Sequence, residues 1–209
     1  MLQRVSFAVA GTEIEALLHL PDGETLGGTA VLPGRGGTME DTAYLCESLA
    51  AAGIAALRFT FRVDGDPLAG LADAGGAVRL LRAHPAIPQR IGLLGWSFGG
   101  AVAAMAAGRD SRIRAAVLVA TPAARDYFGN AKPLAEISRT RAKVLLVRPG
   151  ADEVVPAGDA DRYAAVLVQA RVAHRIVTIA GADHTFTRPA ERAEMLVAVT
   201  TWLREVLAA

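Results

Sequence analysis

Short apolar segments alternate with longer segments of helical character along most of this chain. The apolar segments predict strands at residues 4–10, 13–20, 29–32, 54–60, 91–94, 113–120, 143–148 and 174–180. The other segments predict helices at residues 39–52, 68–83, 101–108, 157–170 and 190–207. Near-continuous apolar strands that alternate with helices are typical of a mostly parallel sheet covered by helices on both faces.

Two glycine-containing sites modify this pattern. The first two strands are joined at Gly11-Thr12, which predicts an antiparallel hairpin at the N-terminal end of an otherwise parallel sheet. Gly75-Gly76 lies inside the helix expected at 68–83 and lowers the helix propensity of that segment. No internal repeat, linker or low-complexity tract interrupts the alternation, so we expect one α/β domain over residues 1–209.

Composition and charge narrow the classes of partner. Apolar residues make up 52% of the 209 residues and aromatic residues only 5%, which indicates a core of Ala, Val and Leu. The net charge is +1 and no run of Lys and Arg is present, so we expect no nucleic-acid partner. No apolar run approaches 18 residues, so we expect no membrane partner either.

The single cysteine and the N-terminal sequence bear on location. Cys46 lies within an apolar helical pattern, so it is interpreted as part of the core rather than as a nucleophile. One cysteine allows no internal disulfide, and the first residues lack a signal-peptide pattern, which together favour the cytoplasm. An edge strand or the last helix offers a surface for a homodimer, although no motif specifies one.

The segment Gly95-Trp96-Ser97-Phe98-Gly99-Gly100 carries the clearest chemical motif. A strand precedes it and a helix follows it, which is the context of a G-x-S-x-G nucleophile elbow. Small residues suit this turn because strand and helix nearly touch there. Ser97 is therefore the candidate nucleophile, exposed at the N-terminus of a helix whose dipole favours negative charge.

A serine nucleophile needs a base and a group that orients the base. Among the four histidines only His184 lies in a glycine-led loop just beyond the carboxyl end of a predicted strand, where functional groups gather in parallel sheets. Asp152 lies in the corresponding loop after the preceding strand and is the candidate acid, ahead of its neighbour Glu153. Asp159 and Asp161 are the other competitors, and both are expected on the exposed face of the following helix. Asp183, adjacent to the histidine, is expected to brace the loop.

Two backbone N–H groups are the expected donors to the oxyanion of a tetrahedral intermediate. The first is that of Phe98, at the head of the elbow helix. The second is that of Arg35, in the glycine-rich loop Leu32-Pro33-Gly34-Arg35-Gly36-Gly37. This loop lacks both the P-loop Lys-Ser/Thr pair and a complete G-x-G-x-x-G, which argues against phosphate binding.

Over nearly its whole length, the chain resembles the α/β-hydrolase superfamily. The elbow 95–99, the acid loop 150–156 and the histidine loop 181–186 occur in the family order. The resemblance is strongest to compact dienelactone-hydrolase-like proteins and short bacterial esterases. It implies a Ser-His-Asp hydrolase without a metal or organic cofactor. Dienelactone hydrolases carry cysteine where this chain has Ser97, and many relatives have His-Gly where it has Pro33-Gly34.

The substrate site is expected to be open, because only about twenty residues, 121–141, separate two strands where relatives often insert a lid. The candidate pocket residues are Trp96, Tyr127, Phe128, Val155 and Phe186. These features predict hydrolysis of a carboxylic ester of a small molecule. The same residues would serve a thioesterase, an amidase or peptidase, or an acyltransferase, and a non-catalytic binding protein of this fold is the remaining alternative.

Overall fold

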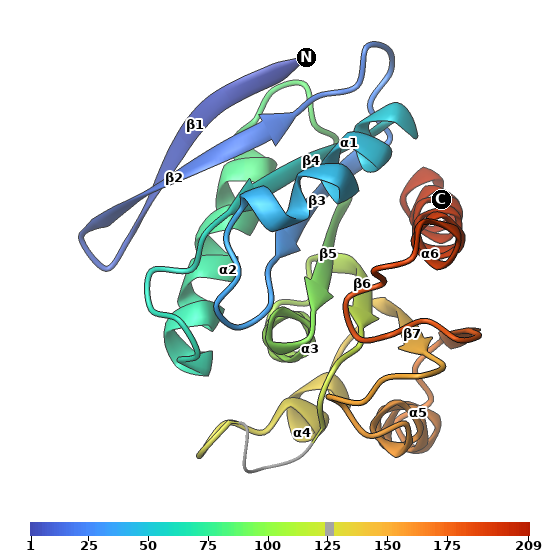
Figure 1. Cartoon of the computed structure of the whole chain (residues 1–209). Coiled ribbons are helices and arrows are strands. Elements are labelled where there is room, and N and C mark those ends of the chain that lie inside the picture. Colours follow the sequence, from blue (N-terminus) through green and yellow to red (C-terminus); the bar gives the residue numbers. More distant parts are fainter. Residues whose placement is uncertain (124–127) are drawn as a thin grey trace.

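The computed structural model describes residues 1–123 and 128–209, and a twisted eight-stranded sheet forms its centre (Figure 1). The strand order is β1-β2-β4-β3-β5-β6-β7-β8. The strands are β1 (Leu2–Val9), β2 (Thr12–His19), β3 (Gly27–Leu32), β4 (Ile54–Phe59), β5 (Ile91–Trp96), β6 (Ile113–Val119), β7 (Lys143–Pro149) and β8 (His174–Ile179). The pairs β1–β2 and β2–β4 are antiparallel and all others are parallel, which confirms the predicted hairpin and mostly parallel sheet.

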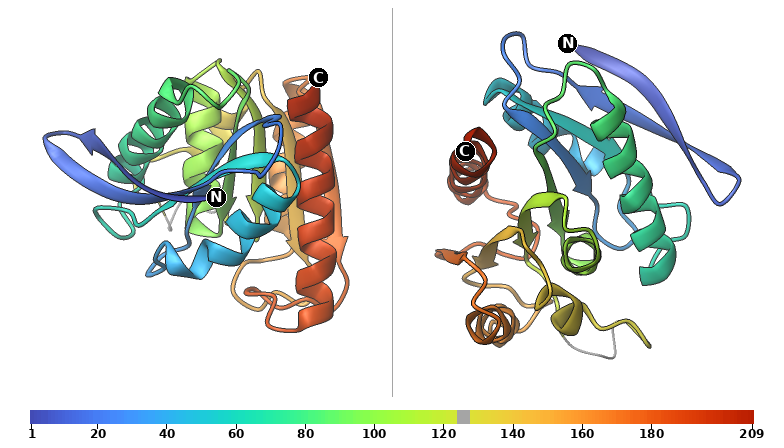
Figure 2. Two further views of the ribbon diagram at one scale, coloured as in Figure 1. Left: turned by 90° about the horizontal axis from the view of Figure 1, so that it is seen from above. Right: turned by 180° about the vertical axis from the view of Figure 1, so that it is seen from behind.

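Helices cover both faces of the sheet (Figure 2). The helices are α1 (Ala43–Ala51), α2 (Pro67–Ala83), α3 (Phe98–Arg109), α4 (Pro133–Ile137), α5 (Gly158–Gln169) and α6 (Pro189–Ala208). Buried side chains of α1 and α6 form one hydrophobic layer with the sheet, and those of α2, α3 and α5 form the other. Cys46 of α1 is fully buried in the first layer, as expected, and burial raises the pKa of its thiol to about 12.

Most predicted boundaries are accurate to within two residues, and two differ for physical reasons. The strand expected to end at residue 94 continues to Trp96, and the helix expected from residue 101 begins at Phe98, so Ser97 alone connects β5 and α3. The helix expected at 39–52 is divided into a 3-10 turn, η1 (Glu40–Thr42), and α1. Met39, at the start of η1, bonds to the side chains of Arg58 in β4 and of Thr60 just after β4, which holds this turn apart from the helix axis.

The connection between β6 and β7 contains no large lid in its described part, where α4 is the only helix and has five residues. Residues 124–127 of this connection lie outside the described part. No helix among the described residues is long and apolar enough to cross a membrane.

The two adjacent glycines of α2 have different surroundings. An ideal Cβ on Gly76 would lie 2.6 Å from side-chain atoms of both Phe7 and Val9, so the β1–β2 hairpin packs directly on the helix backbone. An ideal Cβ on Gly75 would have only the mobile end of Arg79 nearby, at 3.6 Å. Close packing therefore explains one helix glycine and leaves the other without a packing role.

This difference gives a matched test of the fold. Gly76→Ala is expected to lower the free energy of unfolding by about 1–3 kcal/mol, because the new methyl group overpacks the hairpin contact. Gly75→Ala is expected to raise it by up to about 1 kcal/mol through helix propensity. Thermal unfolding followed by circular dichroism measures both, and equal shifts in the two variants would contradict the packing of β1 on α2.

Candidate active site

Ser97 occupies a sharp turn between β5 and α3. Its backbone has φ 51° and ψ −115°, a left-handed conformation that non-glycine residues rarely adopt. The Ser97 N–H donates to the carbonyl of Val119 at 2.8 Å, which fastens the turn to the end of β6. The elbow predicted from the motif is therefore present, with its serine at the N-terminus of α3.

Glycines allow this turn because backbones meet closely around it. A Cβ on Gly95 would overlap the carbonyl oxygen of Gly99, the second residue of α3. A Cβ on Gly99 would overlap the carbonyl oxygens of Leu32 and Pro33, at the end of β3. The N-terminus of α3 is thus pressed between two strand ends, which directs the serine to the carboxyl edge of the sheet.

His184 and Asp152 meet at the same edge. His184 Nδ1 lies 2.9 Å from Oδ2 and 3.1 Å from Oδ1 of Asp152. Oδ1 also accepts the N–H groups of Val154 and Val155, each at 2.9 Å, so the carboxylate is held by its own loop. The Asp152 side chain is 3% exposed and that of His184 is 15% exposed. A proton on Nδ1 donated to the carboxylate leaves the Nε2 lone pair for another group.

The rival carboxylates are engaged elsewhere or exposed. Glu153 is exposed to solvent, beside Asp152. Asp159 is buried and accepts the N–H of Ala123 at 2.8 Å, and Asp161 pairs with Arg148 at 3.0 Å. Within the described residues, Asp152 is the carboxylate that contacts His184.

Asp183 braces the histidine loop, as the sequence predicted. One of its oxygens accepts the N–H groups of Thr185 and Thr187 at 3.2 and 3.0 Å, and the other accepts the Thr187 hydroxyl. The hydrogen bonds from Thr187 lower the pKa of this carboxyl below its ordinary value. The negative form of Asp183 therefore fixes the turn that presents His184.

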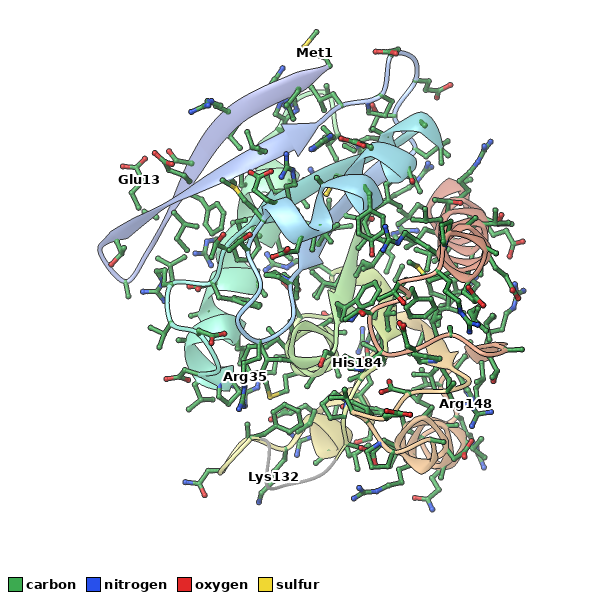
Figure 3. All side chains as sticks on the ribbon, in the orientation of Figure 1. Met1, Glu13, Arg35, Lys132, Arg148 and His184 are labelled. Atoms are coloured by element: carbon green, nitrogen blue, oxygen red, sulfur yellow. The ribbon has the colours of Figure 1, made fainter. Side chains whose placement is uncertain are left out.

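A cavity of about 760 Å³ contains both Ser97 and His184 in its lining. Figure 3 shows the labelled His184 and Arg35 on the two sides of α3, and both residues line this cavity. The loop between β3 and η1 forms one wall, since Pro33, Gly34, Arg35, Gly36 and Gly37 all line it. The structure therefore brings the elbow, the histidine loop and the glycine-rich loop around one space.

The glycine-rich loop passes directly beside the elbow. A Cβ on Gly34 would lie 3.7 Å from the Ser97 Cβ. Asp64, in the loop after β4, accepts the Gly36 N–H at 2.7 Å and holds this wall in place. The Arg35 guanidinium lies 5.9 Å from the centre of the Phe98 ring. Sequence analysis did not find the role of Asp64, because its partner is 28 residues away along the chain.

The five candidate pocket residues have different placements. Trp96, Phe128 and Val155 line the cavity. Phe186 is fully buried behind it and packs edge-on against Trp96 with ring centres 5.3 Å apart, so it supports the wall rather than forming the surface. Tyr127 lies outside the described residues.

The cavity lining includes further residues that were not found from the sequence, among them one aromatic and one cationic side chain. Tyr44, in the first turn of α1, and Arg192, in the first turn of α6, both line the cavity. The Arg192 guanidinium lies 5.2 Å from the Tyr44 ring centre, and its Nε donates to the Phe186 carbonyl at 3.0 Å. Burial raises the pKa of Tyr44 to about 12, so its phenol is a neutral donor. The sequence signal that could have identified Tyr44 and Arg192 is their position in the first turns of helices at the carboxyl edge of the sheet.

Arg62, in the loop after β4, is not among the residues that line the cavity. It pairs instead with the fully buried Asp73 at 2.6 Å and donates to the Val9 carbonyl at 3.3 Å. For metal binding, the described residues contain no group of three or more His, Cys, Asp or Glu side chains suited to an ion.

Comparisons with known proteins identify structures of similar fold. A dienelactone hydrolase from Anabaena variabilis superposes with a TM-score of 0.80 at 23% identity, covering 99% of this chain and 96% of that chain. The esterase domain of a Rhodothermus marinus protein gives 0.79 at 20% identity, covering 99% of each chain. Est1E from Butyrivibrio proteoclasticus gives 0.79 at 17% identity, covering 97% of this chain and 96% of that chain.

These similarities at low identity show a shared α/β-hydrolase fold. No curated protein gives a significant sequence match to the chain. The model of the dienelactone hydrolase family, however, matches residues 58–207, which include the elbow, the acid loop and the histidine loop. The chain therefore belongs to the dienelactone hydrolase family.

Proposed function

We propose that this protein hydrolyses carboxylic esters of small molecules through an acyl-serine intermediate. The observation that carries the proposal is that His184, hydrogen-bonded to Asp152, lines the same cavity as the elbow serine. A base oriented by a buried carboxylate and a serine on a strained turn are the parts that activate a hydroxyl at neutral pH.

In the first step, the Ser97 oxygen attacks the ester carbonyl carbon while His184 Nε2 takes the hydroxyl proton. Asp152 holds the imidazole with Nδ1 protonated and stabilises the cation that forms. The carbonyl oxygen becomes an oxyanion, which the N–H groups of Phe98 and Arg35 stabilise. The Phe98 N–H is among the first N–H groups of α3, which have no partner within the helix.

Collapse of this intermediate breaks the bond to the alcohol, which leaves with the proton from His184. Water then attacks the acyl-serine with His184 as base, and the acid product and free Ser97 are released. Trp96, Phe128 and Val155 provide apolar surface for the substrate, while Tyr44 and Arg192 add polar groups at the α1–α6 side. The alternatives on the same residues differ only in the bond cleaved or in the acceptor that replaces water.

Ser97→Ala tests the nucleophile. This variant is expected to lower kcat/KM for a short-chain aryl ester by at least about 10³-fold, because the attacking oxygen is removed. Wild-type protein treated with a fluorophosphonate should gain one adduct in intact mass, and Ser97→Ala should gain none. Unchanged hydrolysis in folded Ser97→Ala, or an adduct on that variant, would overturn the proposal.

Asp152→Asn and Glu153→Gln form a matched pair for the acid. Asp152→Asn is expected to lower kcat by up to about 10⁴-fold, because an amide favours the wrong histidine tautomer and cannot stabilise its cation. Glu153→Gln changes an exposed neighbour by the same chemistry and should retain near wild-type activity. The reverse order of activities in a steady-state assay would transfer the acid role to Glu153.

A further inference from the structure

A buried arginine lies under the turn that borders the cavity. Arg58 of β4 is 5% exposed. It alternates along the strand with Ile54 and Ala56, which pack in the hydrophobic layer of α1, so its side chain is on the same face of the sheet. Figure 1 shows α1 beside β4. Its Nη1 donates to the carbonyl of Met39 at 2.9 Å and to the carboxylate of Glu40 at 2.8 Å. Both acceptors lie at the start of η1. A charge in a core-facing strand position is costly unless it is fully paired, and these bonds pair it.

The third hydrogen bond of the Arg58 side chain fixes the protonation state of a histidine. Arg58 Nε donates to Nε2 of His19, on β2, at 3.0 Å, and both side chains are buried. An arginine can only donate hydrogen bonds, so Nε2 of His19 must carry a lone pair and Nδ1 the proton. His19 is therefore neutral when it orients Arg58.

The turn held by Arg58 contributes directly to the cavity. Asp41 and Thr42 of η1 line the cavity, and Tyr44 follows them in α1. The Met39 carbonyl that accepts from Arg58 also accepts the Thr42 hydroxyl at 3.0 Å. A change at Arg58 is thus transmitted through one carbonyl to a residue that faces the substrate space.

We propose that Arg58 is a positioning residue for the proposed hydrolysis, and that neutral His19 orients it so that η1 is held in the cavity wall. Protonation of His19 removes the lone pair that accepts from Arg58 and places two cations side by side. Arg58 then no longer holds the start of η1 through its hydrogen bonds, and the cavity wall formed by residues 41–44 loses its fixed position. This inference rests on the proposed function for its kinetic part only.

The surroundings of His19 favour its neutral form. Burial and the adjacent Arg58 lower its pKa below 6.5, and the amino terminus lowers it further, while Glu47 and Glu40 oppose this. The folded protein therefore binds this proton more weakly than the unfolded chain does. The contribution of His19 to the free energy of unfolding is fully present above about pH 6.5 and is lost as the pH falls through the lowered pKa.

His19→Gln gives the sharpest test. The Gln amide oxygen can accept from Arg58 Nε in place of the imidazole nitrogen, yet it does not titrate in this range. As the pH falls below 6.5, the KM of wild type should rise about three- to tenfold relative to that of His19→Gln, because only wild type can lose the acceptor for Arg58 by protonation. The decline of Tm below pH 6.5 should be shallower in His19→Gln than in wild type.

His174→Gln is the matched control, because His174 is also a strand histidine, but it is half-buried on β8 and does not line the cavity. It should retain the wild-type dependence of KM on pH. The same dependence in wild type and His19→Gln would overturn the proposal. The Tm measurement does not depend on hydrolysis, so it tests the Arg58–His19 hydrogen bond even if Ser97→Ala remains active and the hydrolytic proposal fails.

Arg58→Met tests the positioning role separately. Loss of its bonds to η1 should raise KM about three- to tenfold with kcat within about twofold, because the substrate wall moves while the reacting groups do not. Glu40→Gln removes one charged bond from a 66% exposed side chain and should give a smaller rise in KM. If Arg58→Met does not fold, Glu40→Gln and His19→Gln decide the question, and an unchanged KM in folded Arg58→Met would contradict the inference.

Discussion

The close approach of α3 to the ends of β3 and β5 is the constraint on which the candidate site depends. No side chain fits between these backbones at Gly95 and Gly99, so the chain must turn within a single residue. That residue is Ser97, and the turn places it where the loops after the neighbouring parallel strands converge. The location of the site is thus a consequence of backbone packing, before any catalytic contact is considered.

Aspartates bonded to backbone N–H groups hold the loops around this point. Asp152 fixes the acid loop, Asp183 the histidine loop and Asp64 the glycine-rich loop, each with at least one such bond shorter than 3.1 Å. Loops that lack regular secondary structure gain rigidity when side-chain carboxylates accept hydrogen bonds from their backbone N–H groups. The geometry of the cavity therefore rests on the same chemistry in three separate segments.

Much of this arrangement could be predicted from the sequence, because local signals carry it. Apolar periodicity gave nearly all element boundaries, and motif context gave Ser97, His184 and Asp152 as candidates that the structure brings to one edge. The features that could not be predicted depend on contacts between residues that are far apart in the sequence. Phe186 was expected in the cavity but lies one layer behind it, and Arg58 finds its partner His19 across 39 residues of chain. No local pattern distinguishes a cavity wall from its support.

The left-handed backbone of Ser97 has a thermodynamic consequence. This positive-φ conformation costs a residue with a Cβ roughly 1–3 kcal/mol and costs glycine much less. Glycine, which has no hydroxyl group, is therefore the residue with the lowest conformational free energy at this position. Selection for stability alone would replace the candidate nucleophile with glycine, so the fold and its chemistry make opposite demands on a single residue.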